Sequence, residues 1–317
     1  MGGSGSTPQS EKPAPPPPSP EFAKPWRETP WDNKELLEKN LRELKLSDPN
    51  VKYIRILLAG EVGAGKSSFI NSVNSVFQRR ITTEAIADNA GAGGTSFTKT
   101  YRTYYIRNGP SVLPFVFNDI MGLESDYSPK ESRGANKGDI AKAKKPRGAH
   151  PEDIAKALEG LLKEGHNFNP IASANKNDCK SETSLEDLTY CLVYIIAADK
   201  VSMMTHDVIQ KMRYIREKAS SLEIPQAVIM TRVDEVCPLV KTDLRKKIYT
   251  SKKIKEKMQE CSNSVGVPVS HIFPVKNYHE EIDTQNDIDV LILRALTQIV
   301  QIADDLVNRR KSDSGNC

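Results

Sequence analysis

Short apolar runs alternate with amphipathic segments of helical period along most of the chain. Strands are predicted at 54–59, 99–106, 112–117, 191–198, 226–230 and 271–275, and helices at 67–77, 205–221, 241–262 and 287–308. Strands that alternate with helices are typical of a mostly parallel sheet covered by helices on both faces. The pattern therefore predicts an α/β fold built as a three-layer sandwich.

Proline is concentrated near the N-terminus, where nine of the 20 prolines lie within the first 30 residues. Because proline lacks an amide donor and favours polyproline II, residues 1–32 are predicted to form a disordered tail. A spacer is the favoured role, and a ligand for proline-reading domains is the alternative. The start also fits the N-myristoylation pattern at Gly2, although Gly/Ser repeats match that pattern easily.

The rest of the pattern predicts one domain over 33–310, followed by a disordered C-terminus at 311–317. Leucines at helical spacing predict a helical lead-in at 33–48. A polar segment at 124–187 interrupts the alternation of strands and helices. We interpret this segment as an insertion that contains one helix beginning near Pro151.

The composition favours a globular protein in a reducing compartment. Charged residues make up 27% and hydrophobic residues 38%, and 45 basic against 41 acidic residues leave a net charge of +4. This balance is too mild to indicate a dedicated nucleic-acid binder. The sequence has no apolar run of about 18 residues, no secretory-type segment and no zinc-ligand spacing among its five cysteines. A cytoplasmic location with reduced thiols is expected.

A phosphate-binding loop is the strongest motif, because 60–67 matches G-x-x-x-x-G-K-[ST] between a predicted strand and a predicted helix. Its amides and the helix dipole are expected to surround phosphate oxygens. Lys66 would reach the β- and γ-phosphates, Ser67 would bind Mg²⁺, and Ser68 would touch the α-phosphate. The predicted binding residues are Gly60, Glu61, Val62, Gly63, Ala64, Gly65, Lys66, Ser67 and Ser68. The alternative is a glycine turn that binds nothing.

A second motif, Asp119-Ile120-Met121-Gly122, follows the strand that ends at Phe117. A carboxylate at that strand tip would lie opposite the phosphate loop and could hold Mg²⁺ through water. Gly122 is free to bring its amide to the γ-phosphate. D-x-x-G alone is a weak motif, and its place after a strand makes it persuasive.

A third motif, Thr231-Arg232-Val233-Asp234, follows the strand at 226–230. A carboxylate there suits guanine, whose N1–H and exocyclic amine are both donors, and the aliphatic stem of Arg232 can cover the purine face. Lys276 could contact the base edge, although this signal is weak. A surface ion pair at a strand end is the alternative interpretation of Asp234.

The glycine-rich segment 89–98 is predicted to be mobile, and it carries hydroxyl groups at Thr95 and Thr98. Either threonine could close over Mg²⁺ when a γ-phosphate is bound, which would give an order–disorder switch. We prefer Thr95 as the metal ligand and as a catalytic residue beside Lys66. An ordinary flexible loop is the alternative.

The order of these motifs resembles P-loop GTPases, and further segments resemble the interferon-induced protein 44 family, including its 44-like members. These segments are G-K-S-S-F-I-N-S-V at 65–73, Y-R-T-Y at 101–104, F-N-P at 168–170 and D-I-D-V-L-I-L at 287–293. The resemblance covers about residues 35–310. It implies a cytoplasmic, interferon-responsive protein with GTP-binding character and a role in antiviral or immune regulation.

Three positions depart from the small-GTPase pattern. The guanine motif has Thr231 and Arg232 in place of asparagine and lysine, as dynamin-like GTPases also do. Leu123 stands where small GTPases carry a water-orienting glutamine, so hydrolysis is expected to be slow. We therefore expect a guanine-nucleotide switch with slow GTPase activity, using GTP or GDP and Mg²⁺. The alternatives are a nucleotide-stabilised scaffold without hydrolysis and an ATP-binding protein.

The sequence is less informative about partners. The resemblance implies an unidentified protein partner in immune signalling, and Arg79 and Arg80 could act across a homodimer, although a solvated helix end is favoured. The basic stretch 133–147 could contact anionic membrane, RNA or an acidic protein. A solvated loop is the favoured interpretation, because the stretch contains no aromatic residue for base stacking.

Overall fold

One six-stranded sheet organises the computed structural model, which describes residues 19–85, 98–126 and 145–314. The strand order is β2-β3-β1-β4-β5-β6, in which β2 runs antiparallel to β3 and every other neighbouring pair is parallel. The strands are β1 Ile54–Ala59, β2 Arg102–Asn108, β3 Ser111–Asp119, β4 Thr189–Ala197, β5 Gln226–Thr231 and β6 Ile272–Pro274. This sheet confirms the predicted α/β fold of the P-loop GTPase type.

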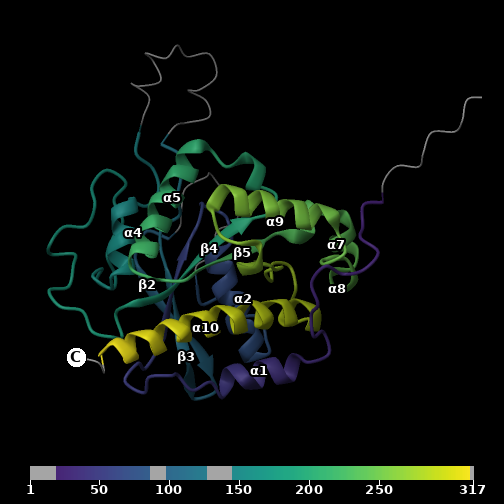
Figure 1. The fold of residues 1–317 in the computed structure, drawn as a ribbon, viewed down its shortest axis with the longest axis horizontal. Coiled ribbons are helices and arrows are strands. Elements are labelled where there is room, and N and C mark those ends of the chain that lie inside the picture. Colours follow the sequence, from purple (N-terminus) through teal and green to yellow (C-terminus); the bar gives the residue numbers. More distant parts are fainter. Residues whose placement is uncertain (1–18, 86–97, 127–144, 315–317) are drawn as a thin grey trace, which may run out of the picture.

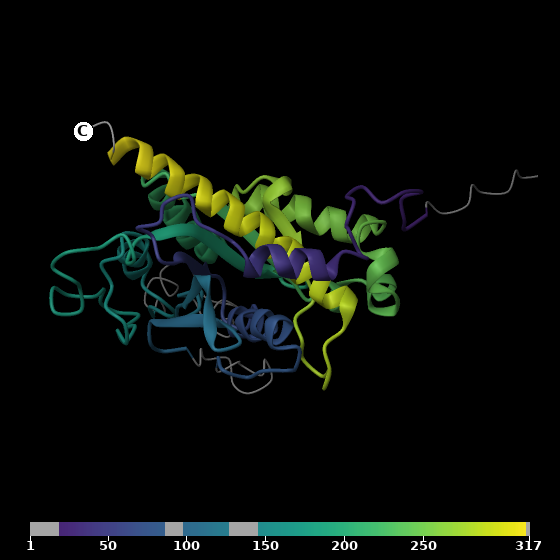
Figure 2. The same cartoon turned by 90° about the horizontal axis from the view of Figure 1, so that it is seen from below.

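Helices cover both faces of the sheet (Figure 1). One layer contains α1, α2 and α10, and Figure 2 shows α1 beside the long helix α10. The other layer contains α4, α5 and α9, so β4 is buried along its whole length. The helices are α1 Lys34–Arg42, α2 Lys66–Gln78, α4 Pro151–Leu158, α5 His206–Ser221, α6 Val233–Val236, α7 Pro238–Thr242, α8 Leu244–Lys247, α9 Lys252–Val265 and α10 Asn286–Ser314, with short 3-10 helices η1 Val201–Met203 and η2 Val269–His271.

The register of the parallel strands aligns their carboxyl ends along one edge of the sheet. Leu58 of β1 pairs with Asp119 of β3 and with Val193 of β4, and Ala197 of β4 pairs with Thr231 of β5. Segments that follow these strands are far apart in the sequence but emerge side by side. Ligands of parallel α/β sheets bind at this edge.

The predicted helix at 241–262 is wrong as a single element. The chain forms α7, α8 and α9 instead, with breaks at Asp243 and Ser251, whose backbones are extended. The Asp243 side chain accepts a hydrogen bond from the Lys246 amide, and the Ser251 side chain accepts one from the Ile254 amide. These polar side chains cap new helices, and such caps compete with continuation of the preceding one.

Residues 19–32 differ from the predicted tail, because they pack on the domain. The Trp26 amide donates to the Tyr249 carbonyl at 3.0 Å, and the Trp26 ring meets the Tyr249 ring edge-on at 5.2 Å. The Arg27 guanidinium donates to the carbonyls of Val269 and Ile272. Aromatic packing thus fixes this segment despite its prolines. Helix α10 likewise extends past the predicted boundary at 310, whereas residues 1–18 and 315–317 lie outside the described structure.

The described part of the insertion, 145–187, joins the sheet edge through backbone hydrogen bonds. The Tyr101 amide donates to the His166 carbonyl at 2.8 Å, and the Phe168 amide donates to the Lys99 carbonyl at 2.9 Å. Helix α4 begins where the sequence predicts and packs against α5. The insertion therefore holds the segment that leads into β2. Most of the basic stretch 133–147 lies outside the described residues.

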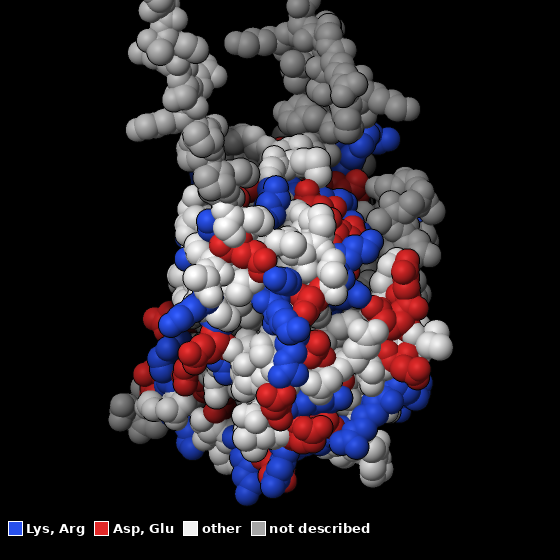
Figure 3. Space-filling model, turned by 90° about the vertical axis from the view of Figure 1, so that its right-hand side faces the viewer, with Lys and Arg blue, Asp and Glu red and all other residues white. Residues whose placement is uncertain are grey.

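Basic and acidic side chains are interspersed on the face that looks to the right in Figure 1, as Figure 3 shows for the described residues. This mixture agrees with the small net charge of +4. Within the described ranges, no helix has the length and apolar character needed to cross a membrane.

Candidate functional site

The loop between β1 and α2 requires glycine at its first position. Gly60 has φ 151°, and a Cβ built there would lie 2.2 Å from the Ile195 carbonyl oxygen of β4. Any side chain would therefore collide with the backbone of the neighbouring strand. Gly65, at the end of the loop, has φ 94° and precedes α2 directly. The loop amides and the first turn of α2 thus face the carboxyl edge of the sheet.

Lys66 is buried, with 6% of its surface exposed. Its Nζ lies 3.4 Å from the Gly60 carbonyl oxygen and 3.2 Å from that of Glu61, so the ammonium group spans the loop. Burial raises the pKa of the Glu61 carboxyl, and Lys200 and Lys66 oppose this shift. The sequence predicted that Lys66 lies over the phosphate loop. It did not predict that Lys200 also lies beside this loop.

A group of oxygen donors meets at the end of β3. Ser67 Oγ donates to Asp119 Oδ2 at 2.8 Å, and Thr98 Oγ1 donates to the same oxygen at 3.2 Å. Asp119 Oδ1 is buried without a hydrogen-bond partner, and burial raises the pKa of this carboxyl against the effect of Lys66. Two hydroxyls and a carboxylate with a spare oxygen are the hard ligands that Mg²⁺ prefers, so these residues fit the ion. Thr95 lies outside the described residues.

The segment after Asp119 packs against the first residues of the phosphate loop. The Leu123 amide donates to the Gly60 carbonyl at 2.9 Å, and the Val62 amide donates to the Leu123 carbonyl at 3.1 Å. A Cβ at Gly122 would come within 2.8 Å of Val62 backbone atoms, so this close approach requires glycine. The Leu123 side chain is 1% exposed and belongs to the core. It is turned away from the solvent that would supply an attacking water.

Thr231 and Arg232 hold the loop from the other side. Thr231 Oγ1 donates to the Ala64 carbonyl at 2.7 Å, and the Arg232 guanidinium donates to the Gly63 carbonyl at 3.0 Å. Arg232 also lies 3.5 Å from the Asp199 carboxylate. The sequence had suggested only a covering role for the Arg232 stem. The structure adds support of the phosphate loop.

The predicted base side is built from ion pairs. Lys276 Nζ lies 3.8 Å from Asp234 and 2.6 Å from Glu281. Asn277 Nδ2 donates to the Gly65 carbonyl at 3.1 Å, which ties this side to the loop. Sequence reasoning missed Glu281 and the Asn277 contact, because 212 residues separate Asn277 from Gly65 and no short motif joins them.

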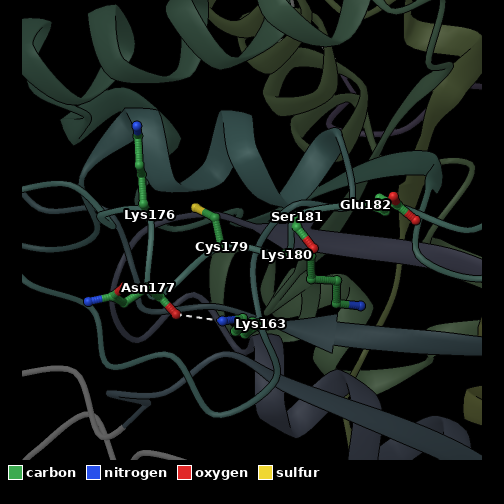
Figure 4. Close-up of a pocket in the computed structure, with 7 residues that line it drawn as sticks. All are labelled: Lys163, Lys176, Asn177, Cys179, Lys180, Ser181 and Glu182. Atoms are coloured by element: carbon green, nitrogen blue, oxygen red, sulfur yellow. Dashed lines mark hydrogen bonds between the residues drawn. The ribbon is translucent and has the colours of Figure 1, made fainter.

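The described part of the insertion lines a cavity of about 660 Å³ and, together with residues of β1 and β2, one of about 290 Å³. The larger is lined by Lys163, Lys176 and Lys180, among others, and Lys163 donates to the Asn177 carbonyl (Figure 4). In the smaller cavity Lys180 pairs with Asp187. Neither cavity includes a residue of the three nucleotide-binding motifs, although Tyr101 and Thr103 of the Y-R-T-Y segment line the smaller one.

Comparison with known proteins supplies relatives over most of this chain. The human (Homo sapiens) interferon-induced protein 44 is 33% identical over 280 residues, which are 86% of this chain and 58% of the relative. The human interferon-induced protein 44-like is 29% identical over 281 residues, 87% of this chain and 57% of the relative. This chain is a homologue of the interferon-induced protein 44 and 44-like proteins.

The mouse (Mus musculus) interferon-induced protein 44 is 29% identical over 272 residues, covering 84% of this chain and 58% of the relative. The chain thus spans somewhat more than half the length of the interferon-induced protein 44 relatives that it matches. No family model matches the chain.

Two solved structures share a distant likeness with this chain. A complex of SsGBP with GDP has a TM-score of 0.36 and 11% identity, covering 85% of this chain and 56% of the other. A nucleolar GTP-binding protein 1 from Plasmodium falciparum has a TM-score of 0.34 and 12% identity, covering 86% and 97%. These scores are too low to support an argument, so the fold assignment rests on the sheet and the loop.

Proposed function

We propose that this chain binds a guanine nucleotide together with Mg²⁺ and hydrolyses GTP slowly. The observation that carries the proposal is the convergence of Lys66, Ser67 and Asp119 at the carboxyl edge of the sheet, on a loop held by Thr231 and Arg232. The buried ammonium, the loop amides and the α2 dipole together favour a phosphate chain at this place.

Each residue has a defined task in this proposal. Lys66 contacts the β- and γ-phosphates, and Ser67, Thr98 and Asp119 hold the metal side. Mg²⁺, when bound, neutralises phosphate charge and orients the phosphate oxygens. Thr95 stays a prediction for the same metal side.

The preference for guanine is assigned to Asp234. Its carboxylate would accept hydrogen bonds from the N1–H and exocyclic amine of guanine, a pair of donors that adenine lacks. Lys276 lies beside Asp234 and can balance its charge while the base enters. The Arg232 stem would cover the face of the purine.

Slow hydrolysis follows from the position of Leu123. Its side chain is apolar and buried, so it cannot orient a water molecule for attack. The same observation favours a second candidate, a nucleotide-stabilised scaffold that hydrolyses nothing. The relatives are named as interferon-induced, and we extend from them a cytoplasmic role in immune or antiviral regulation through a protein partner.

Calorimetric titration of the purified chain with GTP, GDP and ATP in Mg²⁺ tests nucleotide binding. GTP and GDP are expected to bind at least about tenfold more tightly than ATP, because ATP cannot use the Asp234 carboxylate. Absence of binding, or equal affinity for ATP, would refute the guanine-nucleotide proposal.

Multiple-turnover phosphate release then separates the two candidates, with Lys66→Ala as the control. A slow wild-type rate above that of Lys66→Ala supports the GTPase. Equal rates for the two proteins, with GTP still bound by the wild type, support the scaffold.

A further inference from the structure

A second lysine lies over the phosphate loop. Lys200 lies three residues after the end of β4 and directly before η1. Its Nζ lies 3.5 Å from the place that a Cβ would occupy on Gly63, the fourth residue of the loop. Because Gly63 has no side chain, the lysine can extend across this part of the rim. Lys200 is half-buried there.

In the described part of the chain, Lys200 has none of the hydrogen-bond partners that normally satisfy a half-buried ammonium group. Its side chain forms no hydrogen bond or ion pair with any residue that the structure describes. The adjacent carboxylate of Asp199 pairs instead with Arg232 at 3.5 Å. The Lys200 charge also acts on the Glu61 carboxyl, where it opposes the rise in pKa that burial causes. Removing an ammonium group from water without a partner is unfavourable, so an anion at this place would be stabilised.

The phosphate loop indicates where such an anion would bind. Lys66 already carries a positive charge over the loop, and the amides before α2 add partial positive charges. We infer that Lys200 supplies a second ammonium group to the phosphate chain of the bound nucleotide. This inference rests on the proposed nucleotide binding and adds a specific contact to it. Lys200 belongs to none of the recognised motifs, so sequence reasoning did not identify it.

A rival explanation is that Lys200 only balances the buried carboxyl of Glu61. The two explanations differ in what a neutral side chain would change. A phosphate contact predicts weaker nucleotide binding with little effect on folding. A purely structural counter-charge predicts a lower unfolding temperature with unchanged nucleotide affinity.

The test compares the wild type, Lys200→Met and Lys200→Arg. For each protein it measures the affinity for a fluorescent GTP analogue and the unfolding temperature. Lys200→Met keeps the length of the side chain and removes its charge. It is expected to weaken binding by about tenfold at low salt, the usual effect of one charge-assisted hydrogen bond. Lys200→Arg should restore most of the affinity. Lys176→Met, on the exposed insertion, is the matched control and should bind like the wild type.

The outcomes separate this inference from the proposed function. If the wild type binds the analogue and Lys200→Met binds it equally well, Lys200 is not a phosphate contact and the proposed function stands. If Lys200→Met only lowers the unfolding temperature, Lys200 is a counter-charge for Glu61. If the wild type itself does not bind, the proposed function fails and the inference falls with it.

Discussion

The two halves of the candidate site are built in different ways. On the phosphate side, Lys66 and Asp119 are 6% and 1% exposed and are held by backbone carbonyls and hydroxyls. On the base side, the side chains of Asp234 and Lys276 are 20% and 26% exposed and contact each other as an ion pair. The first half is buried, whereas the second consists of partly exposed charges.

This difference shows which part of nucleotide recognition each half can supply. A buried ammonium and fixed amides bind any phosphate chain strongly, whatever base is attached. Partly exposed carboxylates are screened by water and contribute less affinity, but their pattern of acceptors distinguishes one base from another. We therefore expect affinity to depend on the phosphate side and selectivity to depend on the base side.

The largest effect is expected for Lys66→Ala. Affinity for both GTP and GDP should fall by about a hundredfold or more, since a buried charge-assisted contact with the phosphates is lost. Preference between guanine and adenine nucleotides should be unchanged. Calorimetric titration measures both quantities. Arg79→Ala, at the opposite end of α2, is the matched control, and an equal loss in that variant would contradict the assignment of Lys66.

A smaller effect on affinity, with a large effect on selectivity, is expected for Asp234→Asn. GTP binding should weaken by about tenfold, and xanthosine triphosphate should become the preferred nucleotide, because its C2 carbonyl can accept from an amide. Competition against a fluorescent nucleotide measures this preference. Glu235→Gln changes an exposed neighbouring charge and should keep the preference for GTP. An unchanged preference in Asp234→Asn would remove Asp234 from the base side.

Much of the phosphate side could be predicted from the sequence. The contiguous loop identifies Lys66 and Ser67, and the alternation of strands and helices predicts that Asp119 emerges beside them. Parallel neighbours align their carboxyl ends, so the short motifs suffice. The sequence offers little basis for preferring Thr95 over Thr98, because both lie in one glycine-rich segment.

Features built from distant segments could not be predicted. Two examples are the Asn277 contact with Gly65 and the ion pair between Lys276 and Glu281. Both depend on how loops fold back on the domain, and a local sequence pattern does not predict this. The packing of Trp26 on the domain was also missed. The high proline content around it predicts disorder, and one aromatic residue is too weak a signal to change that prediction. The breaks in the predicted helix at 241–262 arise from capping side chains, whose competition with the helix depends on packing.

A moderate effect that depends on Mg²⁺ is expected for Thr98→Val. Thr98 contacts Asp119 in the structure, so loss of its hydroxyl should weaken GTP binding about fivefold in Mg²⁺ and very little in a chelator. Thr95→Val is the natural comparison and should have the smaller effect. A larger loss of GTP binding in Thr95→Val than in Thr98→Val would assign the metal-side role to Thr95. Titration of a fluorescent GTP analogue with and without Mg²⁺ distinguishes these results.

The smallest effect is expected for Glu281→Gln, and it tests whether charge holds the base side together. Burial of Glu281 favours a higher pKa, but hydrogen bonds from the His279 amide and from Lys276 outweigh it and lower the pKa to about 2. A lowered pKa stabilises the folded state above the unfolded value of about 4.5, and this contribution is lost as pH falls toward about 2.

At pH 7, Glu281→Gln should therefore lower the free energy of unfolding by about 1 kcal/mol, and the melting temperature by about 2 °C. The difference from the wild type should narrow as pH falls below about 4.5, because Glu281 of the unfolded chain then takes up a proton while the folded carboxylate stays ionised until about pH 2. Thermal unfolding followed between pH 7 and pH 3 measures it, with the exposed neighbour variant Glu280→Gln as control. A difference that stays constant with pH would mean that packing, rather than charge, orders the base side. The contrast between the two halves of the site would then be one of exposure alone.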